Sequence, residues 1–270
     1  LDPASVRQRL TKHTKAILTV NIFGHPSRLD ELKVVADEHG LMLIEDNAQS
    51  PGMYFHGERC GTVGSMGVLS LNYHKGIQTG EGGVVLTDDK DLAERLQLIR
   101  NHGEVVVGKI DCPDIENTLG WNYRLTEIQA AIGTEQLKKL DKLNGKRSNL
   151  AALLTEKLKK FDFLHTPIIE HDCTHGYYLY PLKFDQAAAG ISRDTFVKAM
   201  QAEGVSLGAG YVKPIYLEPM YQRKIAYGKL HCPFKCPLYK GDVTYEQGLC
   251  PTAERMHFRD LMTTDICKHP

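Results

Sequence analysis

No run of apolar residues in this sequence approaches the length of about 18 that a membrane-spanning helix needs. Residues 1–20 also lack the charged-then-apolar layout of a secretory signal peptide. Neither sign of charge dominates, because 33 Lys and Arg residues balance 33 Asp and Glu residues. A formal net charge of zero gives no electrostatic reason to bind nucleic acid or an anionic membrane. We therefore expect neither as a partner.

The sequence also lacks a regular cysteine framework. Its seven cysteines are odd in number and scattered along 270 residues, whereas disulfide-stapled domains are short and carry closely spaced pairs. This pattern predicts reduced thiols and a cytoplasmic location. With 42% hydrophobic and 24% charged residues, the composition is that of an ordinary globular protein, and the length suits one large domain or two modest ones.

The first half of the chain alternates strand and helix signals. Short apolar or β-branched runs favour strands at 15–24, 41–46, 63–72 and 82–89. Helical spacing of apolar residues favours helices at 27–40 and 90–103. Short buried strands that alternate with helices are typical of a largely parallel sheet covered on both faces. The predicted fold class is therefore α/β.

Local signals refine this prediction. The first helix has cap signals in Ser27 and Asp30 and a stop signal in Gly40. Asp46 and Asn72 each end a predicted strand. Because ligands collect at the carboxyl ends of the strands in such sheets, we expect a ligand near these two side chains.

The second half of the chain has a different pattern. Helical spacing continues from Leu125 to Phe161, and Gly145 is expected to bend or break this long helix. A smaller α+β unit should follow, with a strand at 177–184, a helix at 192–204 and a strand at 205–212. The remaining tail is rich in Pro, Tyr, Cys and Gly and is expected to be mostly loop. We predict two domains, at 1–145 and 146–270.

The stretch SLNYHKGIQTGEGG, at 70–83, places Lys75 between a short apolar run and a glycine-rich turn. Taken alone, such a lysine is usually solvated. In the same way, an acid at a strand end is usually a cap or a surface group, and Asn122 in NYRLTEIQAA could simply cap a helix. No single motif therefore assigns a function.

Together the motifs resemble a known family. An acid closes a strand in EDNAQS (45–50), SLNYHK and TGEGG follow (70–83), and GWNYRLTEIQAAIGTEQL (120–137) opens a long helix. In this order they are similar to the DegT family of pyridoxal-phosphate-dependent sugar aminotransferases, which have the fold type I architecture. The resemblance is strong from Thr14 to Leu140 and weaker beyond, where GLCPTAERM (248–256) is similar to a late stretch of the family.

The resemblance implies roles for particular residues. Lys75 would form a Schiff base with the cofactor, since burial beside a cationic group makes a lysine less basic and able to attack as a neutral amine. Asp46 would pair with the protonated pyridine nitrogen of pyridoxal phosphate and keep the ring an electron sink. Ser70 would donate to the phosphate, and Gln49 would lie near the ring. Asn122 would reach the phosphate of the neighbouring subunit's cofactor, which implies a homodimer.

The chain also departs from the family pattern. Asn21 and Asn72 stand where the family usually has histidine, and Asn47 replaces a commoner small residue. We expect these changes to bear on substrate choice more than on the cofactor. Family members carry a segment before the equivalent of Leu1 and a helix after the equivalent of residues 265–270. The resemblance thus implies a fold type I sheet that is incomplete at its N-terminal side, followed by the small α+β domain.

The activity implied by the resemblance is transamination. The enzyme would move an amino group from an amino acid, with glutamate as the expected donor, to a nucleotide-linked keto sugar in amino-sugar or polysaccharide biosynthesis. Two alternatives stay open. Sugar dehydratases of the family replace the lysine by histidine, so Lys75 favours transamination. A non-catalytic or regulatory cofactor-binding relative, or an inactive fragment, is the other alternative.

The tail offers weaker alternatives. Cys232 and Cys236 form a Cys-x3-Cys pair that falls within the looser spacings of zinc ligands. The other candidate ligands, His231, Cys250 and His257, have no regular spacing, and thiols packed as small hydrophobes are the favoured interpretation. The tyrosines and basic residues of 211–240 suit either a sugar-nucleotide groove or ordinary loop packing. TGEGG lacks the spacing and the Lys-Ser/Thr ending of a nucleotide phosphate loop. No metal is predicted.

Overall fold

The structure is a computed structural model that describes residues 1–104 and 119–266. The chain forms two compact units. The first unit contains residues 1–150 and 169–178, and the second contains residues 151–168 and 179–270. Residues 169–178 thus return to the first unit after the long helix, which a division at a single point does not anticipate. The sequence-based boundary at residue 145 stays a prediction.

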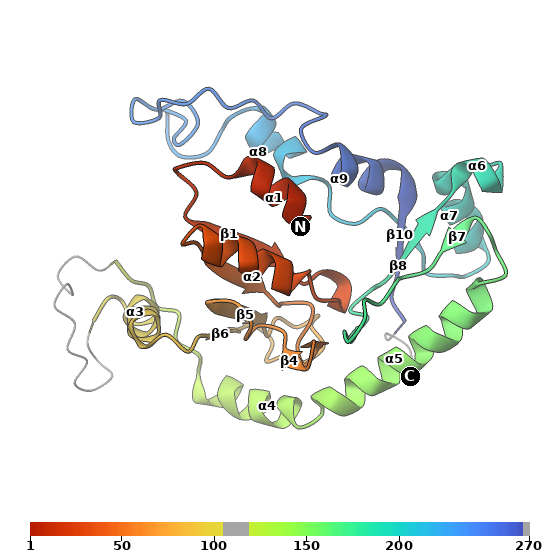
Figure 1. The fold of residues 1–270 in the computed structure, drawn as a ribbon, viewed down its shortest axis with the longest axis horizontal. Helices are drawn as coiled ribbons and strands as arrows, with labels where there is room; N and C mark the ends of the chain where they lie inside the picture. Colours follow the sequence, from red (N-terminus) through yellow and green to blue (C-terminus); the bar gives the residue numbers. More distant parts are fainter. Residues whose placement is uncertain (105–118, 267–270) are drawn as a thin grey trace. The chain divides into compact units, whose positions relative to one another are not determined.

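The first unit is built on a four-stranded sheet with the order β1-β2-β5-β6 (Figure 1). β1, β2 and β5 are parallel, and β6 runs antiparallel to β5. This mixed, mostly parallel sheet agrees with the predicted α/β class. The elements of the unit are α1 (Pro3–Arg9), β1 (Ala16–Val20), the 3-10 turn η1 (Ile22–Gly24), α2 (Leu29–Glu38), β2 (Met42–Asp46), β3 (Tyr54–Phe55), β4 (Glu58–Arg59), β5 (Met66–Ser70), β6 (Gly83–Leu86), α3 (Lys90–Arg100), α4 (Glu127–Leu137) and the first part of α5 (Leu140–Leu158).

α2 covers β1 and β2 because its apolar residues recur at helical spacing. Leu32 and Val35 are fully buried against Ile17 of β1 and Leu43 of β2. The helix ends as expected before Gly40, whose φ of 61° suits glycine. Its start differs from the prediction, since the N-cap position is Arg28 and no side chain caps the helix.

Ser27, predicted as a cap, is bonded elsewhere. Its Oγ lies 2.8 Å from Oγ1 of Thr19 and donates to the carbonyl of Val20 at 3.0 Å. Its backbone N–H donates to Oδ1 of Asn21 at 2.9 Å. The hydroxyl therefore ties the loop after β1 to the strand, and these tertiary partners replace the local capping bond that the sequence favoured.

The long helical segment is broken at a different place from the one predicted. α4 ends at Leu137 and α5 begins at Leu140, so Gly145 lies inside α5. One interior glycine costs a helix only about 1 kcal/mol, and here Leu140 and Asn144 are buried on the same helix. The Nδ2 of Asn144 also donates to the carbonyl of Pro51 at 3.0 Å. Packing therefore outweighs the local preference of the glycine.

α4 begins with a capping box. The side chain of Thr126 accepts from the N–H of Gln129 at 3.2 Å, and Oε1 of Gln129 accepts from the N–H of Thr126 at 3.1 Å. The N-cap is thus Thr126. The alternative that Asn122 simply caps this helix is wrong.

The second unit is an antiparallel sheet with the order β7-β8-β10-β9, together with short helices. Its elements are the last part of α5, β7 (Leu164–His165), β8 (Tyr180–Phe184), α6 (Gln186–Ala189), α7 (Arg193–Ala202), β9 (Gly208–Ala209), the 3-10 turn η3 (Ile215–Leu217), α8 (Pro219–Gln222), α9 (Pro251–Arg255), the π-helical turn η4 (Met256–Asp260) and β10 (Leu261–Thr264). The strand expected at 205–212 shrinks to β9.

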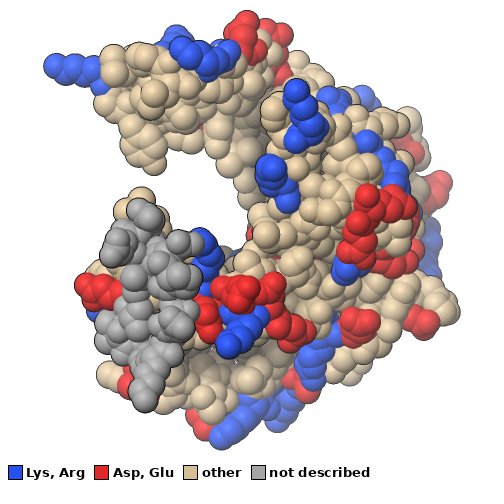
Figure 2. Space-filling model, turned by 60° about the vertical axis from the view of Figure 1, so that its left-hand side comes forward, with Lys and Arg blue, Asp and Glu red and all other residues tan. Residues whose placement is uncertain are grey.

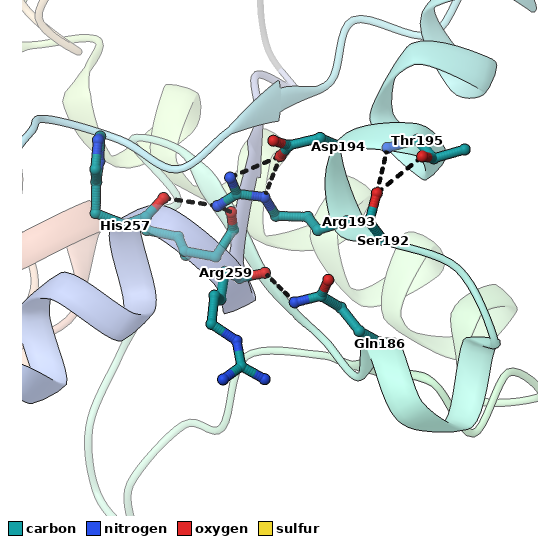
Figure 3. A network of polar contacts seen from close by, with 8 residues as sticks. Gln186, Ser192, Arg193, Asp194, Thr195, His257 and Arg259 are labelled. Carbon is teal, nitrogen blue, oxygen red and sulfur yellow. Dashed lines mark hydrogen bonds and ion pairs between the residues drawn. The ribbon is translucent and has the colours of Figure 1, made fainter.

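The tail contributes more to this sheet than the sequence predicted. β10 pairs with both β8 and β9, and Met262 is fully buried between them. The side chain of Arg193, 5% exposed, fixes the turn before this strand. Its Nη1 donates to the carbonyls of His257 and Leu261 at 2.6 and 3.1 Å, and its Nε and Nη2 donate to the carboxylate of Asp194 (Figure 3). Tertiary pairing and one buried guanidinium therefore order a segment that reads locally as loop.

On the face shown in Figure 2, basic and acidic side chains lie interspersed, as expected for equal numbers of the two signs. Among the described helices, none combines the length and the apolarity that crossing a membrane would need. Five cysteines lie in the described part of the chain, namely Cys60, Cys173, Cys232, Cys236 and Cys250, and each is a free thiol. Cys112 and Cys267 lie outside the described residues.

Candidate active site

Asp46 and Ser70 end neighbouring strands of the first unit's sheet. Asp46, the last residue of β2, pairs with Val68 of β5, and Ser70 ends β5 two residues later. The Asp46 carboxylate is partly buried, and its Oδ1 accepts the N–H of Ala48 at 3.1 Å. Because β2 and β5 are parallel, their carboxyl ends meet at one edge. The structure therefore places a carboxylate and a hydroxyl on neighbouring strand ends, at the edge where ligands collect.

Lys75 reaches the same edge from the turn that follows β5. Its backbone N–H closes this turn on the carbonyl of Asn72 at 2.9 Å, and its side chain is half-buried. Burial lowers the pKa of the Lys75 ammonium, while the negative charge of Asp46 acts in the opposite direction. Lys75 and Asp46 are thus close enough to interact, and the amine is more readily neutral than that of a solvated lysine.

The glycine-rich turn after Lys75 contains positive φ angles that favour glycine, at Gly80 and Gly82. Gly82 has a φ of 149°, and a Cβ there would lie 3.0 Å from Oγ1 of Thr79. That hydroxyl donates to the carbonyl of Glu81 at 2.8 Å, and the Glu81 carboxylate accepts from Nδ2 of Asn72 at 2.7 Å. Asn72, which also ends a predicted strand, is therefore committed to holding the turn beside the lysine.

Gln49 lies in the turn that follows β2, three residues after Asp46. Its Oε1 accepts the N–H of Phe23 at 2.7 Å. Phe23 belongs to η1, the turn after β1, and has a φ of 59° that is unusual for a residue other than glycine. The Gln49 side chain thus connects the ends of two neighbouring strands at the same edge of the sheet as Asp46.

Asn122 is not joined to this group. Its backbone pairs with that of Asn101, its Oδ1 accepts the N–H of Arg124 at 3.4 Å, and its side chain is exposed. Within the described ranges, no hydrogen bond or ion pair connects it to Asp46 or Lys75. The structure therefore brings together Asp46, Gln49, Ser70 and Lys75, and leaves Asn122 on the surface of the unit.

A buried polar network beneath this edge was not predicted from the sequence. The side chains of Asn21, Glu45 and Asn47 are all 0% exposed. The Glu45 carboxylate accepts from the backbone N–H groups of Gly61, Val63 and Gly64 at 2.7–2.9 Å and from Nδ2 of Asn21 at 3.1 Å. These bonds replace the water that a buried carboxylate loses, and they hold the 61–64 loop under β2.

Asn21 and Asn47 act in the same framework. Nδ2 of Asn21 donates to Oδ1 of Asn47 at 3.2 Å, and Nδ2 of Asn47 donates to the carbonyl of Cys60 at 2.8 Å. The backbone N–H of Asn21 donates to the carbonyl of Asp46. Substrate choice was the expected role of both asparagines, yet their complete burial favours a role in fixing the backbone that carries Asp46. One signal was available in the sequence, because Glu45 shares the inward face of β2 with Leu43.

Two cavities lie away from these residues. One, of about 560 Å³, is in the second unit and is lined by Gln186, Ala187, Ser192, Arg193, Asp194, Phe258 and Arg259. The other, of about 510 Å³, lies between α1 and the start of β2 and is lined by residues of 10–15 and 39–41. Neither cavity is lined by Asp46, Ser70 or Lys75, so the candidate site at Lys75 rests on the chemistry of its side chains and not on a cavity.

The zinc site considered for the tail gains no support from the described residues. Across residues 1–104 and 119–266, no three His, Cys, Asp or Glu side chains are grouped as metal ligands. Cys232 and Cys236 interact with each other, which raises the pKa of the Cys232 thiol and lowers that of Cys236. Within the described residues, the pair therefore consists of two thiols that interact with each other.

Comparison with known proteins identifies the family. The sequence model of the DegT/DnrJ/EryC1/StrS aminotransferase family matches residues 1–256. The chain is 34% identical over 222 residues to dTDP-3-amino-3,4,6-trideoxy-alpha-D-glucose transaminase of Streptomyces venezuelae, which covers 82% of this chain and 55% of that protein. The chain spans less than two thirds of the length of the curated relatives it matches.

Solved structures agree with this result. DesV of S. venezuelae superposes with a TM-score of 0.79 at 31% identity, covering 97% of this chain and 62% of that one. The E. coli GDP-4-keto-6-deoxy-D-mannose-3-dehydratase superposes with a TM-score of 0.77 at 26% identity, covering 98% and 66%. The family resemblance and the fold type I class predicted from the motifs are confirmed.

Proposed function

Because the chain belongs to the DegT/DnrJ/EryC1/StrS aminotransferase family, we propose that it transfers an amino group from an amino acid to a keto sugar with pyridoxal phosphate as cofactor. The observation that carries the proposal is the half-buried Lys75 amine beside the Asp46 carboxylate at the carboxyl edge of the sheet. Burial without a fully compensating partner is what keeps a lysine reactive at neutral pH.

The donor set at this edge fits the cofactor. An amine suits its aldehyde, a carboxylate suits its pyridine nitrogen, and a hydroxyl at a strand end suits its phosphate. Asp46 supplies the carboxylate from β2, Ser70 supplies the hydroxyl from β5, and Lys75 supplies the amine from the turn after β5. Gln49, fixed by the N–H of Phe23, is proposed to lie against the ring. When bound, the cofactor supplies an electron sink for the carbon from which a proton is removed.

Lys75 is proposed to have two tasks. Its neutral amine would hold the cofactor covalently, and its lowered pKa favours that neutral form. Its Nζ would also be the base that accepts a proton from the substrate carbon and the acid that returns a proton. Both tasks need the amine at a fixed position. The hydrogen bond from the backbone N–H of Lys75 to the carbonyl of Asn72 holds the turn that carries it.

Asp46 is proposed to orient the cofactor and to keep its ring nitrogen protonated. The N–H of Ala48 fixes its Oδ1 at 3.1 Å, and the backbone of Asp46 is held by the N–H of Asn21. A carboxylate held this rigidly pairs with a cationic ring nitrogen at little cost in conformational entropy. The same carboxylate also interacts with Lys75. Asp46 would therefore affect both the cofactor ring and the lysine amine.

For the substrates we propose glutamate as donor and a nucleotide-linked keto sugar as acceptor, in amino-sugar or polysaccharide biosynthesis. The relative named dTDP-3-amino-3,4,6-trideoxy-alpha-D-glucose transaminase supports the sugar class. The aromatic and basic residues of 211–240 are proposed to bind the sugar nucleotide, since such side chains suit sugars and phosphates.

For the assembly we propose a homodimer in which Asn122 reaches the cofactor of the partner subunit. Its exposed position, away from the Asp46–Lys75 pair of its own chain, supports this arrangement. The division into a cofactor domain at 1–145 and a smaller domain at 146–270, and the cytoplasmic location, are carried forward as predictions.

One second candidate has a specific observation behind it. A sugar 3-dehydratase superposes on this chain as closely as several aminotransferases do. That reaction also uses an aminated cofactor, but the resemblance associates it with histidine in place of the lysine. Lys75 therefore favours transamination, and a regulatory relative without activity is the third possibility.

The proposal is tested by the donor half-reaction. We expect the protein with added pyridoxal phosphate to convert glutamate to 2-oxoglutarate in a single turnover, with one keto acid per active site. Lys75→Ala should produce none, while Lys33→Ala, which changes an exposed lysine on α2, should match the parent. Cofactor binding without keto acid from glutamate or another amino acid would overturn the aminotransferase assignment.

A further inference from the structure

We propose that Tyr178 is a positioning residue for the Lys75 amine, with its ring covering the ammonium group. Nζ of Lys75 lies 4.8 Å from the centroid of the Tyr178 ring. The two residues are 103 positions apart in the sequence, and both belong to the first unit. The inference rests on the proposed role of Lys75, but the contact itself can be tested in the absence of cofactor.

The segment that delivers Tyr178 is fixed by backbone bonds. The N–H of Thr174 donates to the carbonyl of Tyr54 at 3.0 Å, and Oγ1 of Thr174 accepts the N–H of Tyr54 at 2.7 Å. The N–H of Gly176 donates to the carbonyl of Gly24 at 2.7 Å. This segment therefore crosses the turn after β1, at the edge where Asp46 and Lys75 lie.

The crossing is too close for ordinary side chains. A Cβ on Gly24 would lie 2.6 Å from the backbone N of Tyr177, and one on Gly176 would lie 3.1 Å from Sδ of Met53. Tyr177 itself has a φ of 46°, in the left-handed region that residues other than glycine seldom adopt. Strained backbone of this kind persists only where its surroundings enforce it, and it is concentrated at functional sites.

Stacking fixes the strained residue. The rings of His175 and Tyr177 are parallel, with centroids 3.8 Å apart, and both side chains are buried. Nδ1 of His175 accepts the N–H of Tyr177 at 3.0 Å, and the carbonyl of His175 accepts from Oγ of Ser148 at 3.0 Å. The direction in which Tyr178 leaves the segment is thus set by its two predecessors.

The Tyr178 ring acts on Lys75 through its negative face. A ring within about 6 Å of an ammonium group favours the charged form by about two- to fivefold in the protonation equilibrium at a partly exposed site. Among the described residues, the charged or titratable groups near the lysine include Asp46 on β2, Arg147 of α5, which lies against Gly76, and His74, whose ring is 6.3 Å from that of Tyr178. The ring therefore holds the free amine in place between its two proposed tasks and shields one side of it from water.

The test measures the protonation of Lys75 in protein without added cofactor. Trace acetic anhydride acetylates only the neutral amine, and peptide mass spectrometry follows Lys75 as the pH is raised. The pH midpoint reports protonation, whereas a change in access alters only the plateau. Tyr178→Leu keeps an apolar group over the lysine but removes the ring face, so its midpoint should fall by the equivalent of a two- to fivefold change in the protonation constant. Tyr178→Phe should keep the parent midpoint.

Tyr73→Leu is the matched control, because Tyr73 is two residues from Lys75 but 71% exposed, with its ring on His74. Its midpoint should equal that of the parent. Tyr178→Met replaces Tyr178→Leu if the latter does not fold, as judged by circular dichroism. An unchanged midpoint in the apolar variant, or an equal shift in Tyr178→Phe or in Tyr73→Leu, would overturn the proposal. Because no cofactor is present, none of these outcomes depends on whether the protein transaminates.

Discussion

Glu45 shows, at the scale of a single residue, how the candidate site is supported from below. Its carboxylate is fully buried and satisfied by backbone N–H groups and by Asn21. Glu45→Gln would turn an amide NH₂ toward donors, leaving buried N–H groups without an acceptor. We expect the free energy of unfolding to fall by about 2–5 kcal/mol, measured by urea denaturation.

The control for this change is Glu135→Gln. Glu135 forms an exposed ion pair with Lys138 on α4, and such pairs contribute about 0.5 kcal/mol or less. If Glu45→Gln changed stability as little as Glu135→Gln, the network would not be the framework that carries Asp46.

His175 makes a prediction about pH. Burial lowers its pKa to about 3, with the charge of His25 acting in the same direction. In the unfolded chain a histidine titrates near pH 6.5, so between about 3 and 6.5 the unfolded state binds more protons. The contribution of this group is complete above about pH 6.5 and is lost as the pH falls toward 3, with a slope of up to about 1.4 kcal/mol per pH unit.

The measurement is urea denaturation at a series of pH values in that window. His175→Asn keeps an acceptor for the N–H of Tyr177 but cannot titrate, so its stability should depend less steeply on pH than that of the parent. His13→Asn, at an exposed position, should leave the slope unchanged. Equal slopes in His175→Asn and the parent would show that His175 is not the buried neutral group described.

The position of Asp46 was predictable because an acid ends a predicted strand of a parallel sheet, where ligands collect. The roles of Asp46, Ser70 and Lys75 came from the family resemblance and stay predictions. Tyr178 could not be found in this way, because its approach depends on a chain crossing that no local pattern encodes. The burial of Asn21 could not be predicted either, because complete burial is a property of the packed structure, and its expected effect on substrate choice stays a prediction.

At the scale of elements, Gly145 carries a clear prediction. It lies in the interior of α5, and a Cβ there would meet no atom within 4 Å. Gly145→Ala should therefore raise the free energy of unfolding by about 0.5–1 kcal/mol, because alanine loses less backbone entropy in a helix. The gain is measured by urea denaturation.

Gly24→Ala is the opposite case. Its φ is 103° and its Cβ would meet the backbone of Tyr177 at 2.6 Å, so we expect a loss of more than about 1 kcal/mol. A stability loss in Gly145→Ala comparable to that in Gly24→Ala would mean that Gly145 is required by α5 for a reason other than helix propensity.

The elements of the first unit followed from periodicity because apolar spacing and burial agree there. α2, β2 and β5 lie within or next to their expected ranges. β10 was missed because four residues with little alternation gain their strand conformation only by pairing with β8 and β9. The break between α4 and α5 was placed at the wrong residue, since burial of Leu140 and Asn144 offsets the weak helix preference of Gly145.

At the scale of the whole molecule, the motifs of the first unit identified the family, and its sequence model extends over both units, to residue 256. The match to the DesV structure includes more than nine tenths of this chain but less than two thirds of the DesV chain. The activity is therefore stated as a proposal. The other proposals depend on one claim, which is that Lys75 binds the cofactor covalently.

The most direct test is an absorbance titration of the protein with pyridoxal phosphate, run beside Lys75→Ala. The account predicts a visible absorbance band in the parent that borohydride removes, leaving the cofactor fixed to the peptide that contains Lys75. Lys75→Ala should show no such band while retaining its circular dichroism. The same band in Lys75→Ala, cofactor fixed to another lysine, or no band in the folded parent would contradict the account.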